Sequence, residues 1–279
     1  MIGLGIWPPR LEGTLRASRL KRVIMPTPGI LPGIAIRIEL RNGRALRLAR
    51  HIIVNPDAQK TRWICYLDLL GFKKLVLGKG WLSVFASYSK TIERLKRSPN
   101  YASKTRELWF SDTFVLYTED DTLDSFLAIE QKARYLTYFL ITDGIPLRGS
   151  IAFGEYYADE NTGIQFGKAL IEAYEYGEGQ DWIGLIQCPS AVAALEQRGI
   201  EVDAQLNYPI WEIPFKESFQ PAIRRLPTYR IGEHAVINGR NLCLDALHDM
   251  RRRVDGASVL QKYDRTIAFL ERNRIQRGE

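Results

Sequence analysis

Residues 66–76 read YLDLLGFKKLV. The run begins like a buried β-strand, yet it carries Asp68 in its apolar middle and continues into Gly71, Phe72 and two lysines. A buried carboxylate is costly unless a cation meets it. The stretch therefore predicts a salt bridge or a metal ion at Asp68, or else an aspartate that only marks the start of a loop.

The composition indicates one main globular domain. The chain has 279 residues, of which 46% are hydrophobic. No run approaches the roughly 18–20 apolar residues of a membrane span, and no signal peptide is recognisable. We therefore expect a cytoplasmic protein without a membrane partner. The three cysteines are odd in number and far apart, which excludes a disulfide framework and a zinc site of CxxC type.

The net charge of +7 has its source at the start of the chain. Residues 1–62 hold 12 of the 39 Lys and Arg residues but only 3 of the 32 Asp and Glu residues, so the remainder is slightly acidic. We therefore expect no nucleic-acid partner for the main body. The predicted organisation is a basic, flexible extension over 1–61, a main domain over 62–240 and a basic helical segment over 241–279.

The periodicity of the apolar residues from Trp63 onward predicts an α+β fold. We expect strands over 62–70, 107–118 (a pair), 145–157 and 182–187, and helices over 81–97, 122–141, 167–178 and 190–199. This order contains a ferredoxin-like β-α-β-β-α-β unit, with helices on one face of the sheet and the other face free for a partner. Further strands over 205–240 and helices over 241–277 follow. The helix over 81–97 has apolar positions at Val84, Phe85, Tyr88, Ile92 and Leu95.

A second aspartate, Asp112 in WFSDTFVLY, also stands at a strand end. If the two strands are neighbours, Asp68 and Asp112 converge, which suits Mg²⁺ or Mn²⁺. The carbonyl of Leu69 would be a further ligand, and the amides of Gly71–Phe72 with Lys73 or Lys74 would bind phosphate. A single aspartate at a strand end is more often a turn residue, but two of them in this topology favour a metal site.

The segments YLDLLGF, WFSDTFVLY and PLRGSIAFG, followed by FGKALIEAYE, resemble in this order the class III nucleotidyl cyclase homology domain over about residues 62–190. The resemblance implies a head-to-tail homodimer with its active sites at the interface and two divalent ions, Mn²⁺ or Mg²⁺, per site. It gives Asp68, Leu69 and Asp112 as metal ligands and Gly71–Phe72 as the triphosphate turn. The helix over 167–178 would complete the partner subunit's site.

The sequence departs from the purine cyclases of this family at four positions. Leu108 and Ile164 stand where the family has base-selecting polar residues, and Ile171 and Glu175 stand where it has an asparagine and the arginine of the transition state. The chain resembles more closely the compact bacterial pyrimidine cyclases of the Pycsar antiphage system. That resemblance implies a UTP or CTP cyclase whose cyclic UMP or cyclic CMP activates an effector; it does not decide between UTP and CTP.

Two other functions stay open. The missing purine-selecting and transition-state residues also fit a catalytically silent dimer that binds a nucleotide or nucleic acid. A palm-type enzyme such as a dinucleotide cyclase shares the two-metal chemistry, but the chain lacks a GGDEF-like signature.

The remaining candidates are two basic residues and several aromatic residues. Arg148 in PLRGS is a candidate for phosphate binding, and Lys168 at the start of a predicted helix is a candidate for the partner's base pocket, with Leu108 and Ile164. Several aromatic residues near the site, which could stack on a base but suit the core better, are Tyr66, Phe110, Tyr156 and Tyr174. The three histidines have no partner spacing and no assigned role: His51, His234 and His248.

Overall fold

The computed structural model describes residues 60–97, 104–159, 163–205, 208–233, 236–237 and 240–273, together with three short strands near the N-terminus. The chain forms two compact units, Met1–Ala58 and Gln59–Glu279. The first contains an antiparallel sheet of β1 (Arg22–Val23), β2 (Ile38–Arg41) and β3 (Arg44–Leu46). The rest of the predicted extension, with His51, lies outside the described residues, as does His234.

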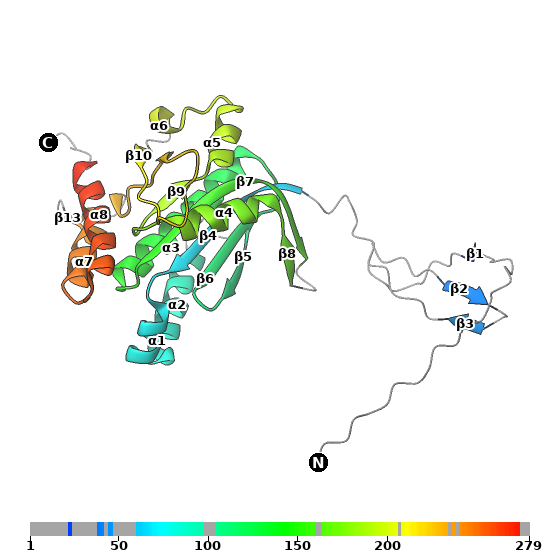
Figure 1. The fold of residues 1–279 in the computed structure, drawn as a ribbon, viewed down its shortest axis with the longest axis horizontal. Helices are drawn as coiled ribbons and strands as arrows, with labels where there is room; N and C mark the ends of the chain where they lie inside the picture. Colours follow the sequence, from blue (N-terminus) through cyan, green and yellow to red (C-terminus); the bar gives the residue numbers. More distant parts are fainter. Residues whose placement is uncertain are drawn as a thin grey trace, which may run out of the picture. The chain divides into compact units, whose positions relative to one another are not determined.

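The second unit contains the predicted β-α-β-β-α-β arrangement. Its sheet has the order β5-β6-β4-β7-β8, and all of these neighbours are antiparallel (Figure 1). A further strand, β9, pairs parallel to β7. The bounds are β4 (Lys60–Leu69), β5 (Thr105–Phe110), β6 (Thr113–Thr118), β7 (Leu147–Asp159), β8 (Ile164–Phe166) and β9 (Leu185–Gln187). The predicted α+β class with a ferredoxin-like strand order is confirmed.

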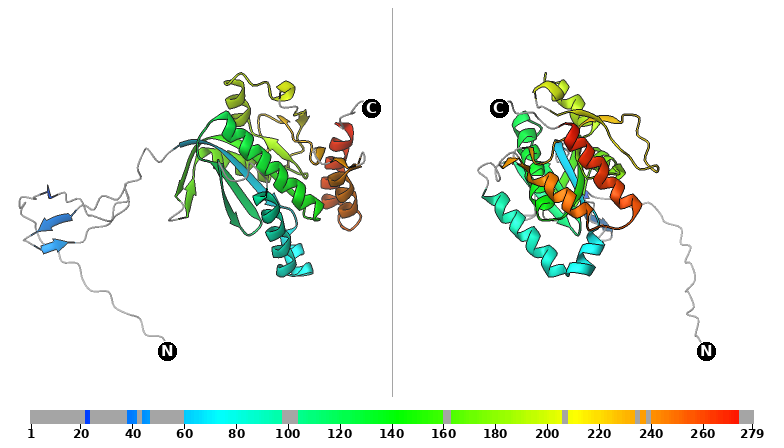
Figure 2. Two further views of the ribbon diagram at one scale, coloured as in Figure 1. Left: turned by 180° about the vertical axis from the view of Figure 1, so that it is seen from behind. Right: turned by 90° about the vertical axis from the view of Figure 1, so that its left-hand side faces the viewer.

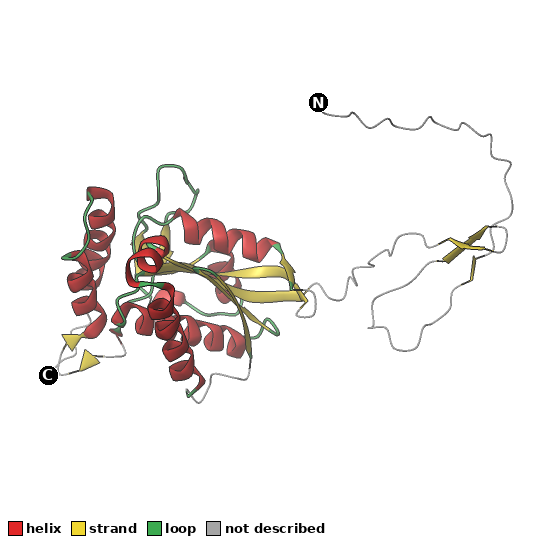
Figure 3. Ribbon diagram, turned by 90° about the horizontal axis from the view of Figure 1, so that it is seen from below, coloured by secondary structure: helices red, strands yellow, loops and turns green. Residues whose placement is uncertain are grey.

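Helices cover both faces of this sheet (Figure 3), so the prediction of helices on one face was wrong. Trp63, Cys65 and Leu67 pack with α3 (Leu123–Thr142) in one core cluster. The intervening Ile64 and Tyr66 pack in a second cluster with α4 (Lys168–Gly179). The physical reason is that β4 is apolar on both sides of its pleat, so each side has to be buried.

Two helices follow β4 where one was predicted. α1 (Phe72–Lys79) and α2 (Trp81–Lys96) meet at Gly80, whose φ of 82° breaks the helix. α2 buries Val84 and Leu95 on the side of α3, and the pair projects from the body of the domain (Figure 1, Figure 2). Phe85, which the sequence placed among the apolar positions of this helix, is 60% exposed.

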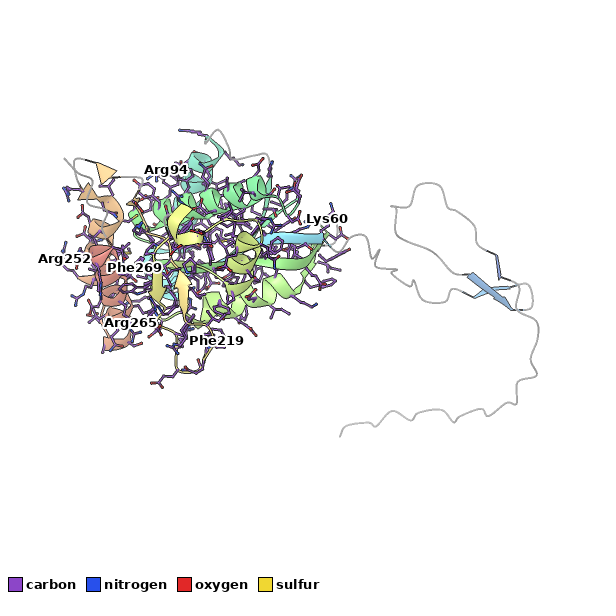
Figure 4. The ribbon with its side chains drawn as sticks, turned by 90° about the horizontal axis from the view of Figure 1, so that it is seen from above. Lys60, Arg94, Phe219, Arg252, Arg265 and Phe269 are labelled. Carbon is purple, nitrogen blue, oxygen red and sulfur yellow. The ribbon has the colours of Figure 1, made fainter. Side chains whose placement is uncertain are left out.

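The C-terminal half adds shorter elements: α5 (Pro189–Glu196), α6 (Val202–Gln205), β10 (Ile210–Glu212), β11 (Arg225–Pro227), β12 (Val236–Ile237), β13 (Arg240–Asn241), α7 (Leu242–Arg251) and α8 (Ala257–Arg272). α7 and α8 bury Leu247 and Phe269 in the main core, so this basic segment is part of the second unit. Figure 4 shows Phe269 and Arg265 at the opposite end of the unit from Lys60. Among the described residues, no helix is long and apolar enough to cross a bilayer.

Candidate functional site

The paired strands β4 and β6 bring Asp68 and Asp112 to the same end of the sheet. Asp68 lies opposite Thr113, and the backbone N–H of Leu69 donates to the Asp112 carbonyl at 3.0 Å. Ser111 precedes Asp112 in the turn between β5 and β6 with a φ of 59°, in the left-handed region. The turn thus places Asp112 one residue from the register partner of Asp68.

The buried carboxylate of Asp68 is met by an arginine. Arg148 lies opposite Asp68 in the β4–β7 register and is 5% exposed. Its Nε and Nη2 atoms both donate to Asp68 Oδ2, at 3.1 and 3.0 Å, and its Nη1 donates to the Gln180 carbonyl at 2.9 Å. Of the three explanations that the sequence allowed for Asp68, the salt bridge is therefore present within the chain itself.

A third charged residue, Glu178, completes the cluster, and sequence reasoning missed it. Arg148 Nη2 donates to Glu178 Oε2 at 2.5 Å, the Tyr66 hydroxyl donates to Oε1 at 3.1 Å, and Lys216 Nζ lies 3.7 Å from Oε2. Tyr66 is thus tied to the site by its hydroxyl rather than being plain core. The available signal was a glutamate between two glycines, in YGEG, at the end of the predicted helix.

The two carboxylates around Arg148 differ in acidity. Burial raises the pKa of Asp68 to about 7, because loss of water disfavours the charged form; Arg148 opposes this and Glu178 adds to it. Burial acts on Glu178 in the same direction, but Arg148, Asp68 and Lys216 together hold the pKa of Glu178 below its ordinary value. Asp68 is therefore the member of the pair that takes up a proton first.

A glycine allows α4 to approach the sheet at this point. A Cβ on Gly177 would lie 2.6 Å from the Tyr66 ring and 3.5 Å from the Ser150 hydroxyl. Ser150 in turn donates to the Ala173 carbonyl of α4 at 2.5 Å. The close approach is what carries Glu178, the next residue, to Arg148 and Tyr66.

The oxygen atoms around Asp112 suit a hard cation that takes most of its ligands from water and substrate. Within the described part of the chain, Asp112 makes no side-chain hydrogen bond or ion pair, and no cluster of three or more Asp, Glu, His or Cys could enclose a metal. Two carboxylates and the Leu69 carbonyl are all oxygen donors. Mg²⁺ and Mn²⁺ are commonly held by one or two carboxylates with water and substrate phosphates. The residues present therefore fit the predicted ion.

Tyr88 on α2 adds an unusual group beside the two aspartates. Its hydroxyl is buried and has no hydrogen-bond partner among the residues that the structure describes. Burial raises the pKa of Tyr88, and the charges of Asp112 and Asp68 raise it further, which places the ring near both carboxylates. No sequence signal marked this residue beyond its place in the apolar stripe.

The phosphate-binding candidates follow β4 directly. Gly71 has a φ of 72° and precedes the first turn of α1, which has no side-chain cap, so the amides at its start are free of side-chain acceptors. Phe72 packs against the core, and Lys73 is exposed. The sequence motif thus forms a left-handed turn into a helix N-terminus, next to Asp68.

The base-pocket candidates lie apart from this cluster. Lys168 begins α4, pairs with Glu155 at 2.9 Å and has an 82% exposed side chain; Glu178 lies near the other end of that helix, about 15 Å away along its axis. Leu108 is 39% exposed, Ile164 47% and Ile171 58%. The structure does not bring these residues to Asp68 of their own chain.

Comparison of the sequence with family models finds no match, and no curated protein matches it. Solved structures do match. The catalytic core of a rhodopsin-guanylyl cyclase with converted specificity, in complex with ATPαS, is 11% identical (TM-score 0.46; 61% of this chain and 94% of that chain covered). The guanylate cyclase domain of RhGC from Catenaria anguillulae, in complex with GTP, is 12% identical (TM-score 0.44; 61% and 94%). An adenylate cyclase from Trypanosoma brucei in the monomeric state is 11% identical (TM-score 0.41; 63% and 98%).

The first prediction concerns Gly177. Gly177→Ala should lower the free energy of unfolding by about 1–3 kcal/mol, because the added methyl group meets the hydrogen-bonded Tyr66 ring and cannot be accommodated without moving α4. The matched control is Gly78→Ala in the exposed part of α1, where nothing lies within 4 Å; it should be neutral or stabilise by up to about 1 kcal/mol. Urea unfolding measures both, and equal effects would contradict the proposed close approach.

The second prediction concerns Arg148. Arg148→Met should cost about 3–5 kcal/mol in unfolding free energy, because it leaves Asp68 and Glu178 together without their cation. Arg240→Met, which breaks the exposed pair with Asp245, should cost less than about 1 kcal/mol. Adding Asp68→Asn to Arg148→Met should restore part of the loss. Failure of this second change to restore stability would show that the cluster is not held by charge.

The third prediction concerns Tyr88. Tyr88→Phe should leave the unfolding free energy unchanged or raise it by up to about 1 kcal/mol, because it removes a buried hydroxyl that has no partner. Tyr66→Phe, which removes a hydroxyl bonded to Glu178, should instead destabilise by roughly 1–2 kcal/mol. Thermal or urea unfolding of the pair tests this, and a clear loss in Tyr88→Phe would mean that the hydroxyl is hydrogen-bonded.

Proposed function

We propose that the chain is a nucleotidyl cyclase that converts a pyrimidine nucleoside triphosphate, UTP or CTP, to the 3′,5′-cyclic monophosphate and pyrophosphate. The observation that carries the proposal is the placement of Asp68 and Asp112 at one end of adjacent strands, directly before the left-handed Gly71 turn into a helix N-terminus. A pair of carboxylates beside free amides suits a metal–triphosphate complex.

In the reaction, the ribose 3′-oxygen forms a bond to the α-phosphorus, the bond from that phosphorus to the pyrophosphate oxygen breaks, and the 3′-hydroxyl gives its proton to solvent water. Asp68, Asp112 and the Leu69 carbonyl would hold divalent ions, Mn²⁺ or Mg²⁺, which supply charge neutralisation and acidify the 3′-hydroxyl. The amides of Gly71–Phe72, with Lys73, would hold the β- and γ-phosphates. The contribution of these residues is positioning and electrostatics.

Arg148 has a different part in this proposal from the one its sequence position suggested. Its guanidinium donates to Asp68, Glu178 and the Gln180 carbonyl. We therefore infer that Arg148 orients Asp68 through its hydrogen bonds to the Asp68 carboxylate. A contact between Arg148 and phosphate would require one of the hydrogen bonds of Arg148 to break. The salt bridge occupies one carboxylate oxygen of Asp68, Oδ2.

The proposal also covers the base of the substrate and the assembly of the chain. Leu108 and Phe110 lie opposite Val115 and Thr113 on the face that α4 covers over β4 and β7, and they are left 39% and 78% exposed. A second copy covering this face would bury them and could bring its Lys168 to the site. An apolar Leu108 offers adenine or guanine no hydrogen bond, which supports a pyrimidine.

The role in the cell is proposed from the resemblance alone. A cytoplasmic cyclase of this kind makes cyclic UMP or cyclic CMP as a second messenger in antiphage defence, and the product reaches an effector protein. UTP and CTP are both compatible with the residues at the site.

A catalytically silent, nucleotide-binding dimer is the second candidate function. One structural observation favours it: Asp68 already has a cation, Arg148, and so needs no metal to be stable in its buried place. Ile171 and Glu175, which stand where the transition-state residues are expected, support it as well.

The test is turnover of each nucleotide with Mn²⁺, followed by chromatography of the products. We expect a cyclic pyrimidine monophosphate, and a loss of at least about 100-fold in Asp68→Asn and Asp112→Asn, because each removes a metal carboxylate. Asparagine keeps an acceptor for Arg148, so the fold should persist. Asp255→Asn, at an exposed position without a charged partner among the described residues, is the control and should keep full activity.

The other outcomes separate the alternatives. A cyclic purine product would overturn the pyrimidine assignment, and linear or cyclic dinucleotides would indicate a palm-type enzyme. Nucleotide binding without turnover would favour the silent dimer. Near wild-type turnover in either aspartate variant would remove the basis of the site.

A further inference from the structure

The turn between α1 and α2 exposes a group of large apolar side chains that the proposed cyclase does not use. We call these four residues the hairpin tip: Leu77 (76% exposed), Trp81 (64%), Leu82 (63%) and Phe85 (60%). They lie at the end of α1 and in the first turns of α2, in the helical pair that projects from the domain (Figure 1, Figure 2). A single exposed leucine needs no explanation, but a contiguous apolar group marks an interaction surface.

Most of the α2 part of the hairpin tip lies off the buried side of that helix. The buried side is formed by Val84, Thr91 and Leu95, at intervals of seven and four residues. At about 100° per residue, Phe85 lies about 100° around the helix from Val84, and Leu82 lies about 160° from it. Trp81 is three residues before Val84 and so lies on the buried side, but it is in the first turn of the projecting helix and stays 64% exposed.

The charge around the hairpin tip has one sign. From Leu69 to Ile92 the sequence contains no Asp or Glu but four lysines. Lys73 and Lys74 are exposed, and neither has a charged partner in the described part of the chain. Lys90, also exposed, forms an ion pair with Asp143 at 3.6 Å.

We propose that the hairpin tip docks on an anionic phospholipid surface, with its apolar side chains between the headgroups and the lysines beside them. Trp, Phe and Leu next to Lys are the combination that binds the membrane interface. Anionic lipids attract each nearby basic residue. The tip is the end of a projecting helical pair, and no described helix spans a bilayer, so the binding would be peripheral.

The same residues suit a protein partner less well. Protein interfaces are depleted of lysine, and their core is broad and fully enclosed. Four side chains on a projecting turn, bordered by lysines, offer a shallow surface of one charge. A second copy that docked tip to tip would bring like charges together.

The test is flotation of the purified full-length chain with vesicles of phosphatidylcholine alone or with about 30 mol% phosphatidylserine. We expect binding to the anionic vesicles, and a partition constant at least about tenfold lower for the combined variant Trp81→Ser, Leu82→Ser, Phe85→Ser. The matched control, Ile223→Ser with Val259→Ser, changes exposed apolar residues elsewhere and should bind as the wild type does. Thermal unfolding confirms that each variant is folded.

The basic residues 1–62 also attract anionic lipid, so the decisive quantity is the difference between the variants. Equal binding of the wild type and the tip variant would overturn the proposal, as would equal binding to neutral and anionic vesicles. Conversion of a wild-type dimer to a monomer by the tip variant, without lipid binding, would make a second copy the occupant and would also overturn it. The vesicles contain no nucleotide, so the result is independent of cyclase activity.

Discussion

The ion cluster of Asp68, Arg148 and Glu178 determines how the main parts of the second unit, Gln59–Glu279, meet. Arg148 comes from β7, Asp68 from the neighbouring β4, and Glu178 from the helix that crosses both strands. A buried guanidinium has five donors in a fixed plane, and leaving any charge in the group unpaired would be costly. The cluster therefore requires a particular register of the two strands and a particular height of α4 above them. Gly177 makes that height possible.

This arrangement has a consequence for any cation at Asp68. One carboxylate oxygen, Oδ2, accepts both bonds from Arg148, while burial raises the pKa of Asp68 to about 7. A divalent ion would therefore compete with a proton for Asp68. Glu178 remains the steady anion for Arg148 in either case, since its pKa is held low. A metal bound at Asp68 in place of a proton would therefore leave the ion pair of Arg148 with Glu178 intact.

The sequence was sufficient for the strand order and for bringing Asp68 and Asp112 to one end of the sheet, and the reasons are local. The end of the apolar run near Asp68 and the interruption at Ser111–Asp112 mark strand ends, and a β-α-β-β order then makes those strands neighbours. The cation that meets Asp68 could not be identified, because Arg148 lies far along the chain and its partner Glu178 depends on the approach of α4. The covering of both sheet faces was also missed, because Ile64 and Tyr66 read equally well as an exposed side that a partner would cover. The sequence also failed to show that Phe85 is exposed. Phe85 directly follows Val84 in α2, so it lies about 100° around the helix from the buried side to which Val84 belongs.

The stretch that begins at Asp68 joins two surfaces through one short helix. α1 follows Gly71, whose φ of 72° makes the proposed phosphate turn, and precedes Gly80, whose φ of 82° makes the turn between α1 and α2. Both glycines hold conformations that other residues avoid, so the eight-residue helix between them is bounded at each end by a glycine turn. A surface that bound the hairpin tip and a triphosphate that bound at Gly71–Phe72 would therefore act on the two ends of one short helix. Any coupling between them would be reciprocal, so each would change the affinity for the other by the same factor.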